Sequence, residues 1–143
     1  MLTDEQREKI KYLSQYRYVN AEIDRKIKEI EMWKSKIYNI TGTLVDMPKS
    51  KNRTNTIEDG ISRINDIESN INADIDRLIK IKKDIERVIN QVKNPNYREI
   101  LKCRYLDCKR YEQIAVDKSI DLRWLYRLHE RALDAVKIKN IDH

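Results

Sequence analysis

Residues that break or rigidify a chain are scarce in this sequence. Its 143 residues include no phenylalanine and only two glycines, two prolines, two cysteines and two histidines. A sheet protein needs more turn-forming residues than this, and the abundant Ile, Lys, Glu, Asp and Arg favour helices. Charged residues (38%) almost match hydrophobic ones (40%), which predicts elongated helices that each bury one stripe. We therefore expect an all-α protein.

Other absences narrow the class of protein. No apolar run approaches the roughly 20 residues that span a bilayer, and Met1 to Ile10 is too polar for a signal peptide, so we expect a cytoplasmic protein without a membrane partner. Cys103 and Cys108 suit reduced thiols, and with His129 they still lack a fourth zinc ligand. With no Gly-rich phosphate loop and no nucleophile beside a base, we predict no enzyme activity, no metal and no cofactor.

The positive charge is concentrated toward the C-terminus. The net charge is +6, and residues from Lys93 onward hold 12 Lys and Arg against 8 Asp and Glu, which makes +4 of that total. A second basic stretch runs from Lys49 to Arg53. This distribution is compatible with nucleic-acid binding but does not establish it.

Residues 1–93 are predicted to form a long antiparallel helical hairpin of the coiled-coil type. The first helix is expected from Thr3, its capping residue, to Thr41, and the second from Ile57 to Val92. A connecting loop is predicted over about 42–56, where Gly42 and Pro48 interrupt the pattern. Both helices carry apolar residues at seven-residue steps, which are Tyr16, Ile23, Ile30 and Ile37 in the first and Ile57, Ile64, Ile71, Leu78, Ile85 and Val92 in the second. Any remaining exposed stripe would suit a homodimer.

Residues 97–138 follow the order of a DNA-binding helix-turn-helix, after a boundary at Asn94-Pro95-Asn96. Short helices are expected at 97–105 and 111–116, and a third helix at 121–137, capped by Asp121. The first exposed turns of a recognition helix reach base edges, and the predicted base-reading residues are Leu122, Arg123, Trp124 and Arg127. Three further basic residues are placed to contact phosphates: Arg110, Lys118 and Arg131.

Each of these residues also has a simpler interpretation. His129 lies on the inner stripe of the third helix and is more simply a packing residue than a ligand or a base. Trp124 could equally be a core residue or face a protein partner. The arginines could form an ordinary solvated helix face.

Several C-terminal motifs resemble those of a known family. They are Ile100-Leu101, Arg104-Tyr105, Tyr111-Glu112-Gln113-Ile114-Ala115 and the run from Tyr126 to Leu133, YRLHERAL. The pattern is similar to the region of sigma factors that binds the promoter −35 element, and more closely resembles small phage late-gene regulators of the ArpU and RinA type. N-terminal motifs with the same resemblance are Tyr12-Leu13, Tyr16-Arg17, Glu22-Ile23, Ile40-Thr41 and Met47-Pro48.

The resemblance implies a helical hairpin joined to a sigma-like helix-turn-helix, acting in phage late transcription in a bacterial host cell, with RNA polymerase as a further partner. There are departures from the family pattern. Asp107-Cys108 stands where the family usually has a glycine, and Asp121 replaces a serine cap. Leu122 and Trp124 are less polar than typical reading residues, so the target DNA cannot be inferred from the family.

Three functions therefore compete. The leading hypothesis is a sequence-specific transcription regulator that activates late genes and reads double-stranded DNA with the helix at 121–137. A small terminase-like DNA-packaging subunit would also join a helix-turn-helix to long helices, and it predicts a ring-shaped oligomer. A helical protein–protein adaptor would bind DNA only weakly and without sequence preference.

Overall fold

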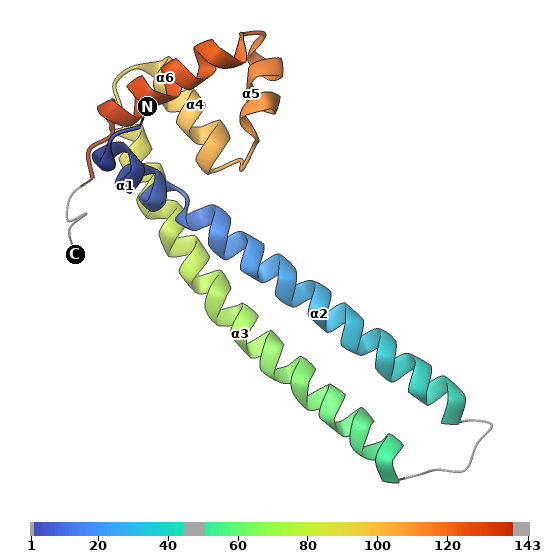
Figure 1. The fold of residues 1–143 in the computed structure, drawn as a ribbon. Coiled ribbons are helices and arrows are strands. Elements are labelled where there is room, and N and C mark those ends of the chain that lie inside the picture. Colours follow the sequence, from blue (N-terminus) through green and yellow to red (C-terminus); the bar gives the residue numbers. More distant parts are fainter. Residues whose placement is uncertain (1, 45–50, 139–143) are drawn as a thin grey trace. The chain divides into compact units, whose positions relative to one another are not determined.

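The computed structural model describes residues 2–44 and 51–138, with the side chains of 40–44 and 51–54 excepted, and these residues contain helices and no strands. The all-α prediction is thus confirmed. No helix in these ranges combines the length and apolar character needed to cross a membrane. In chain order the helices are α1 (Asp4–Leu13), α2 (Gln15–Leu44), α3 (Lys51–Asn90), α4 (Pro95–Tyr105), α5 (Tyr111–Lys118) and α6 (Leu122–Ala135) (Figure 1).

The chain divides into two compact units, and the divisions fall inside the long helices. One unit is Asn20–Arg77, which we call the hairpin unit. The other combines Met1–Val19 with Leu78–His143, and we call it the helix-turn-helix unit.

The hairpin unit is an antiparallel pair formed by α2 and α3 (Figure 1). Lys26 Nζ of α2 lies 2.5 Å from a carboxylate oxygen of Asp74 of α3, and a Cβ at Gly60 of α3 would lie 3.0 Å from Ile37 Cδ1 of α2. Ile37 follows Lys26 along α2 whereas Gly60 precedes Asp74 along α3, so the two helices are antiparallel. Among the side chains that the structure describes, the buried hydrophobic residues of this unit are Ile23, Ile30, Ile64, Ile67 and Ile71. They include the central members of both predicted seven-residue series.

The connection between the long helices is shorter than the predicted loop at 42–56. Helix α2 continues through Leu44 and α3 begins at Lys51, so only 45–50 falls between them, outside the described residues. The prediction took Gly42, Pro48 and the polar residues around them as interruptions of the helical pattern, but Gly42 lies inside α2. Once a helix has formed, each further residue adds a backbone hydrogen bond, so the helix can extend beyond the stripe that it buries. The side chains of the basic stretch Lys49–Arg53 lie outside the described part.

The single helix predicted from Thr3 is interrupted at Ser14. Thr3 does cap α1, because its side chain accepts from the Gln6 amide and the Gln6 side chain accepts from the Thr3 amide. Helix α1 buries Gln6, Lys9 and Leu13 and contacts α6, whereas α2 buries isoleucines in the hairpin unit. The break lets the two segments face different partners, which a single straight stripe cannot do.

The helix-turn-helix unit begins well before the predicted boundary at 94–96. Its main hydrophobic cluster joins Leu13 of α1, Ile85 and Ile89 of α3, Leu101 of α4 and Leu133 of α6. Helix α1 and the last turns of α3 therefore share a core with the C-terminal helices, and they belong to the same unit. Helix α3 ends at Asn90 and α4 starts at Pro95, capped by Asn94, but this connection does not separate two cores.

Gly60 offers a test of the close approach between α2 and α3. Gly60→Leu should lower the stability of the hairpin unit by about 1–3 kcal/mol, because even its Cβ would press on Ile37. Urea unfolding followed by Trp33 fluorescence, in a chain carrying Trp124→Tyr, would measure this. Ser62→Leu, at an exposed position of α3, is the matched control and should leave the midpoint nearly unchanged. Equal effects of the two substitutions would contradict the close packing.

Candidate nucleic-acid interface

Local sequence signals shape the three helices α4, α5 and α6. The Asn94 side chain accepts hydrogen bonds from the amides of Asn96 and Tyr97, and Pro95 occupies the first turn of α4, where its missing N–H costs nothing. The Asp121 side chain accepts from the Arg123 amide, which confirms it as the cap of α6. The helix order therefore matches the predicted helix-turn-helix. Helix α5 extends to Lys118, two residues beyond the prediction, and α6 runs over Leu122–Ala135 rather than 121–137.

Two non-glycine residues with left-handed backbone make the connections. Cys108 has φ 58° in the break between α4 and α5, and Ser119 has φ 55° at the end of α5. Most L-amino acids adopt this conformation only at a cost of about 1–2 kcal/mol, whereas glycine adopts it freely. Cys108 thus adopts a left-handed backbone conformation that a glycine at this position of the break would adopt without steric cost.

Helix α6 has a clear buried side and a clear exposed side. Leu125, His129, Ala132 and Leu133 are buried. With 100° between successive residues, Arg123 and Arg127 fall opposite this buried stripe. Both arginines are exposed, so the structure brings together two of the four predicted base-reading residues.

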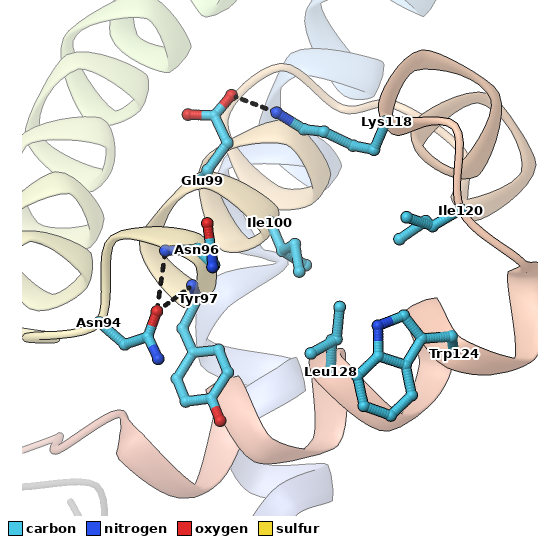
Figure 2. A pocket seen from close by; sticks show the side chains of 9 residues that line it. All are labelled: Asn94, Asn96, Tyr97, Glu99, Ile100, Lys118, Ile120, Trp124 and Leu128. Atoms are coloured by element: carbon cyan, nitrogen blue, oxygen red, sulfur yellow. Dashed lines mark hydrogen bonds and ion pairs between the residues drawn. The ribbon is translucent and has the colours of Figure 1, made fainter.

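The other two predicted base-reading residues lie elsewhere. Leu122 is only partly exposed and packs against the cluster that contains Ile114 and Leu125. Trp124 lines a pocket of about 440 Å³ together with residues of α4 and of the turn after α5. Figure 2 shows its ring beside Leu128 at the edge of this pocket. Leu122 falls three residues before Leu125 and seven before His129, so the periodicity of the buried stripe could have placed it on the inner side. Trp124 falls on a flank of the helix, where packing against neighbours decides which way a side chain is used.

The exposed aromatic Tyr126 was not among the predicted site residues. It lies on a flank of α6, beside the buried stripe, and is 41% exposed, as is Trp124. Its ring meets that of Tyr111 edge to face, with 5.3 Å between centroids. The signal that could have identified it is its position three residues after Arg123, which makes the two neighbours on the helix surface.

The three predicted phosphate contacts differ in their surroundings. Arg110 is exposed at the start of α5. Lys118 Nζ lies 3.1 Å from a Glu99 carboxylate oxygen, and this hydrogen bond lowers the pKa of Glu99 (Figure 2). The Arg131 guanidinium lies 5.3 Å from the centre of the Trp124 ring. Arg110 is therefore the residue of the three whose contacts with the protein compete least with a phosphate.

The residues that carry the family resemblance form a packed cluster. Tyr105 Oη lies 2.7 Å from His129 Nε2, and the Tyr111 hydroxyl lies 3.5 Å from the same nitrogen. Arg104 donates to the Lys109 carbonyl and its guanidinium lies 4.2 Å from the centre of the Tyr111 ring. These contacts join α4, the break, α5 and α6. His129 is a packing residue, as its place on the inner stripe predicted.

Burial sets the protonation of this cluster. Desolvation, with a smaller contribution from Arg104, lowers the pKa of His129 from 6.5 to about 4. Desolvation also raises the pKa of Tyr105, so both side chains are neutral near pH 7. With His129 unprotonated at Nε2, the Tyr105 hydroxyl can donate to it.

Helix α1 holds the C-terminal end of α6, which the sequence did not predict. Lys9 Nζ donates to the Leu133 carbonyl at 3.0 Å, and Gln6 Nε2 donates to Asp134 at 2.9 Å. The last carbonyls of a helix lack partners within it, and a positive charge there is also favourable for the helix dipole. Lys9 is buried, and its ammonium group supplies both the hydrogen bond and the positive charge at this end of α6.

The left-handed backbone at Ser119 yields a stability prediction. Ser119→Gly should raise the free energy of unfolding by about 0.5–1 kcal/mol, because glycine removes the steric cost of the positive φ at an exposed position. Ser119→Ala keeps a Cβ and should bring no gain. Thermal unfolding measured by circular dichroism would compare them, and a gain in the alanine variant would show that the backbone is not the cause.

The lowered pKa of His129 predicts a loss of stability in mild acid. The unfolded chain binds a proton at this histidine near pH 6.5 but the folded chain only near pH 4, so stability is complete above pH 6.5 and falls as the pH drops through this window. Between pH 7.5 and pH 5 the loss should be about 2 kcal/mol. Urea unfolding at several pH values would measure it.

His129→Gln should flatten the dependence of the unfolding free energy on pH. His143→Gln is the control, and it measures how much the other histidine contributes to that dependence. An unchanged slope in the His129 variant would contradict the assignment.

Comparisons with known proteins complete the description of the site. No curated protein and no solved structure matches the chain. Residues 56–137, more than half of the chain and including all of α4, α5 and α6, match the family described as protein of unknown function (DUF1492). The chain therefore belongs to the DUF1492 family.

Proposed function

We propose that this protein is a sequence-specific DNA-binding transcription regulator that reads double-stranded DNA with α6. The observation that carries the proposal is the pair Arg123 and Arg127, exposed in the first turns of a helix whose opposite side is buried. The N-terminal turns of a recognition helix are the part that reaches base edges in a major groove. An arginine can donate two parallel hydrogen bonds to a guanine, each such pair adding about 1–3 kcal/mol of discrimination.

The placement of the side chains refines the proposed reading set. Leu122 packs inward and Trp124 lines a pocket, so we leave both out. Tyr126 joins Arg123 and Arg127, because it is exposed and lies three residues after Arg123, next to it on the helix surface. Arg110 is the leading phosphate contact, and Lys118 must exchange its ion pair with Glu99 to act as one.

The phage-type role in late transcription rests on the sequence resemblance. The motif residues Arg104, Tyr105, Tyr111 and His129 hold the helices together, so they support a shared fold more than a shared DNA target. We accordingly propose a regulator of this type and leave its promoter to be found by selection.

The proposal predicts which substitutions abolish sequence preference. Selection from a random duplex pool would identify the preferred site, and titration of that site and a scrambled duplex would follow at several salt concentrations. Arg123→Ala and Arg127→Ala should each weaken binding to the preferred site by about 5- to 150-fold, which corresponds to 1–3 kcal/mol. Binding to scrambled DNA should change little.

Three controls separate base reading from a general charge effect. Arg77→Ala removes an exposed arginine of the hairpin unit and should leave the preference intact. Arg127→Lys keeps the charge but loses the two-pronged geometry, so the preference should fall while the salt dependence stays. Arg110→Ala should weaken binding to both duplexes and reduce the salt slope by about one. If the intact protein binds preferred and scrambled DNA equally and loses both as salt rises, it is not a sequence-specific regulator, and the adaptor hypothesis is favoured.

A further inference from the structure

The pocket beside Trp124 has one apolar wall. Its volume of about 440 Å³ lies within the helix-turn-helix unit and is of the size that small-molecule sites have. The apolar wall is formed by side chains of α4, of α6 and of the turn between α5 and α6: Tyr97, Ile100, Ile120, Trp124 and Leu128. Trp124 remains 41% exposed although Arg131 lies against its ring. A flat apolar group in the pocket therefore removes indole surface from water, which is favourable.

An ion pair forms the opposite edge of this pocket (Figure 2). Lys118 Nζ lies 3.1 Å from Glu99 Oε1, and the Cys103 thiol donates to the same oxygen at 3.5 Å. These hydrogen bonds, that of Lys118 first, lower the pKa of Glu99, so its carboxylate is charged at neutral pH. Both Glu99 and Lys118 are exposed, so a ligand can reach them from solvent.

Each partner of the ion pair keeps bonding capacity for a ligand. Within the described part of the chain, no hydrogen bond reaches Glu99 Oε2, and Lys118 Nζ has one acceptor, Glu99 Oε1. An ammonium group has three donors, and a carboxylate accepts at both oxygens. A ligand that carries an ammonium and a carboxylate can therefore bind the pair without breaking it. A ligand with a single charge is attracted by one partner but repelled by the other.

We propose that this pocket binds a free aromatic amino acid. The ring packs on the apolar wall, the ligand ammonium donates to Glu99 Oε2, and the ligand carboxylate accepts from Lys118 Nζ. In such a molecule both charged groups lie at one end and the ring at the other, which matches a pocket with an ion pair at one edge and an apolar wall opposite. Glu99 and Lys118 carry the charges among the lining residues, and their sum of zero suits a zwitterion.

Nuclear magnetic resonance of the full chain, without DNA, tests the proposal with L-phenylalanine as the probe. The chain has two tryptophans, and their indole N–H signals serve as site reporter and internal control, because Trp124 lines the pocket and Trp33 belongs to the hairpin unit. L-Phenylalanine should shift the Trp124 signal saturably, with a dissociation constant of about 1 mM or below, and leave the Trp33 signal in place. The absence of a saturable shift of Trp124 up to about 10 mM would overturn the proposal.

Three analogues separate the classes of ligand. Phenylpropionate lacks the ammonium and phenylethylamine lacks the carboxylate, so each should bind at least about 10-fold more weakly than L-phenylalanine. N-Acetyl-phenylalaninamide presents the same ring within a peptide-like molecule that has no charge, and it should also bind more weakly. If any analogue binds as tightly as L-phenylalanine, the pocket does not select a zwitterion and the proposal fails. Tighter binding of the blocked compound would instead favour an aromatic side chain of a protein partner.

Substitutions of the ion pair should reverse the preference between the singly charged analogues. Glu99→Gln leaves the cation in place, so this variant should prefer phenylpropionate over phenylethylamine. Lys118→Met leaves the carboxylate in place and should give the opposite order. Lys109→Met is the matched control, because it removes an exposed lysine whose ion pair with Asp117 lies outside the pocket lining, and it should leave L-phenylalanine binding unchanged.

These variants are expected to fold, because an exposed ion pair contributes little to stability, and far-UV circular dichroism would check this. Equal weakening of L-phenylalanine binding by Lys109→Met and Lys118→Met would show a general charge effect and overturn the assignment of the site. Because binding is measured without DNA, a failure here leaves the proposed base reading by α6 untouched, and a failure of base reading leaves amino-acid binding unchanged.

Discussion

The burial of one side of α6 is the constraint on which the helix-turn-helix unit depends. Leu125 lies in the cluster that α6 forms with α4 and α5, and Ala132 and Leu133 lie in the cluster that it forms with α1, α3 and α4. All three side chains are fully buried. Burying a leucine stabilises by about 1.5–3 kcal/mol, so rotating α6 would cost several such contributions. The orientation of α6 about its own axis is therefore fixed, and it directs Arg123 and Arg127 outward.

One end of α6 is held by the preceding residue and the other by groups from a distant part of the chain. Asp121 caps its start, while Lys9 and Gln6 of α1 bind at its end, more than 120 residues earlier in the sequence. Near the middle, His129 meets the hydroxyls of Tyr105 and Tyr111. The helix proposed to read DNA is thus positioned at its start, centre and end, as an interface that discriminates by hydrogen-bond geometry requires.

Base reading, as proposed, depends on a few exposed donors at the surface of a rigid helix. In the hairpin unit, one flank of the α2–α3 pair leaves large apolar side chains exposed, while the other flank forms ion pairs. Membership in the DUF1492 family covers α4 to α6 and most of α3, and it leaves the DNA target to experiment.

The sequence by itself determined the helix content, most helix boundaries, the caps at Thr3 and Asp121, and the buried stripe of α6. These features depend on residue period and on hydrogen bonds within one turn, which neighbours along the chain decide. Only the tertiary structure decided that α1 belongs with the helix-turn-helix, that Trp124 lines a pocket, and that Lys118 is paired with Glu99. These are contacts between residues far apart in sequence or on the flank of a helix, and their partners follow from how the elements pack.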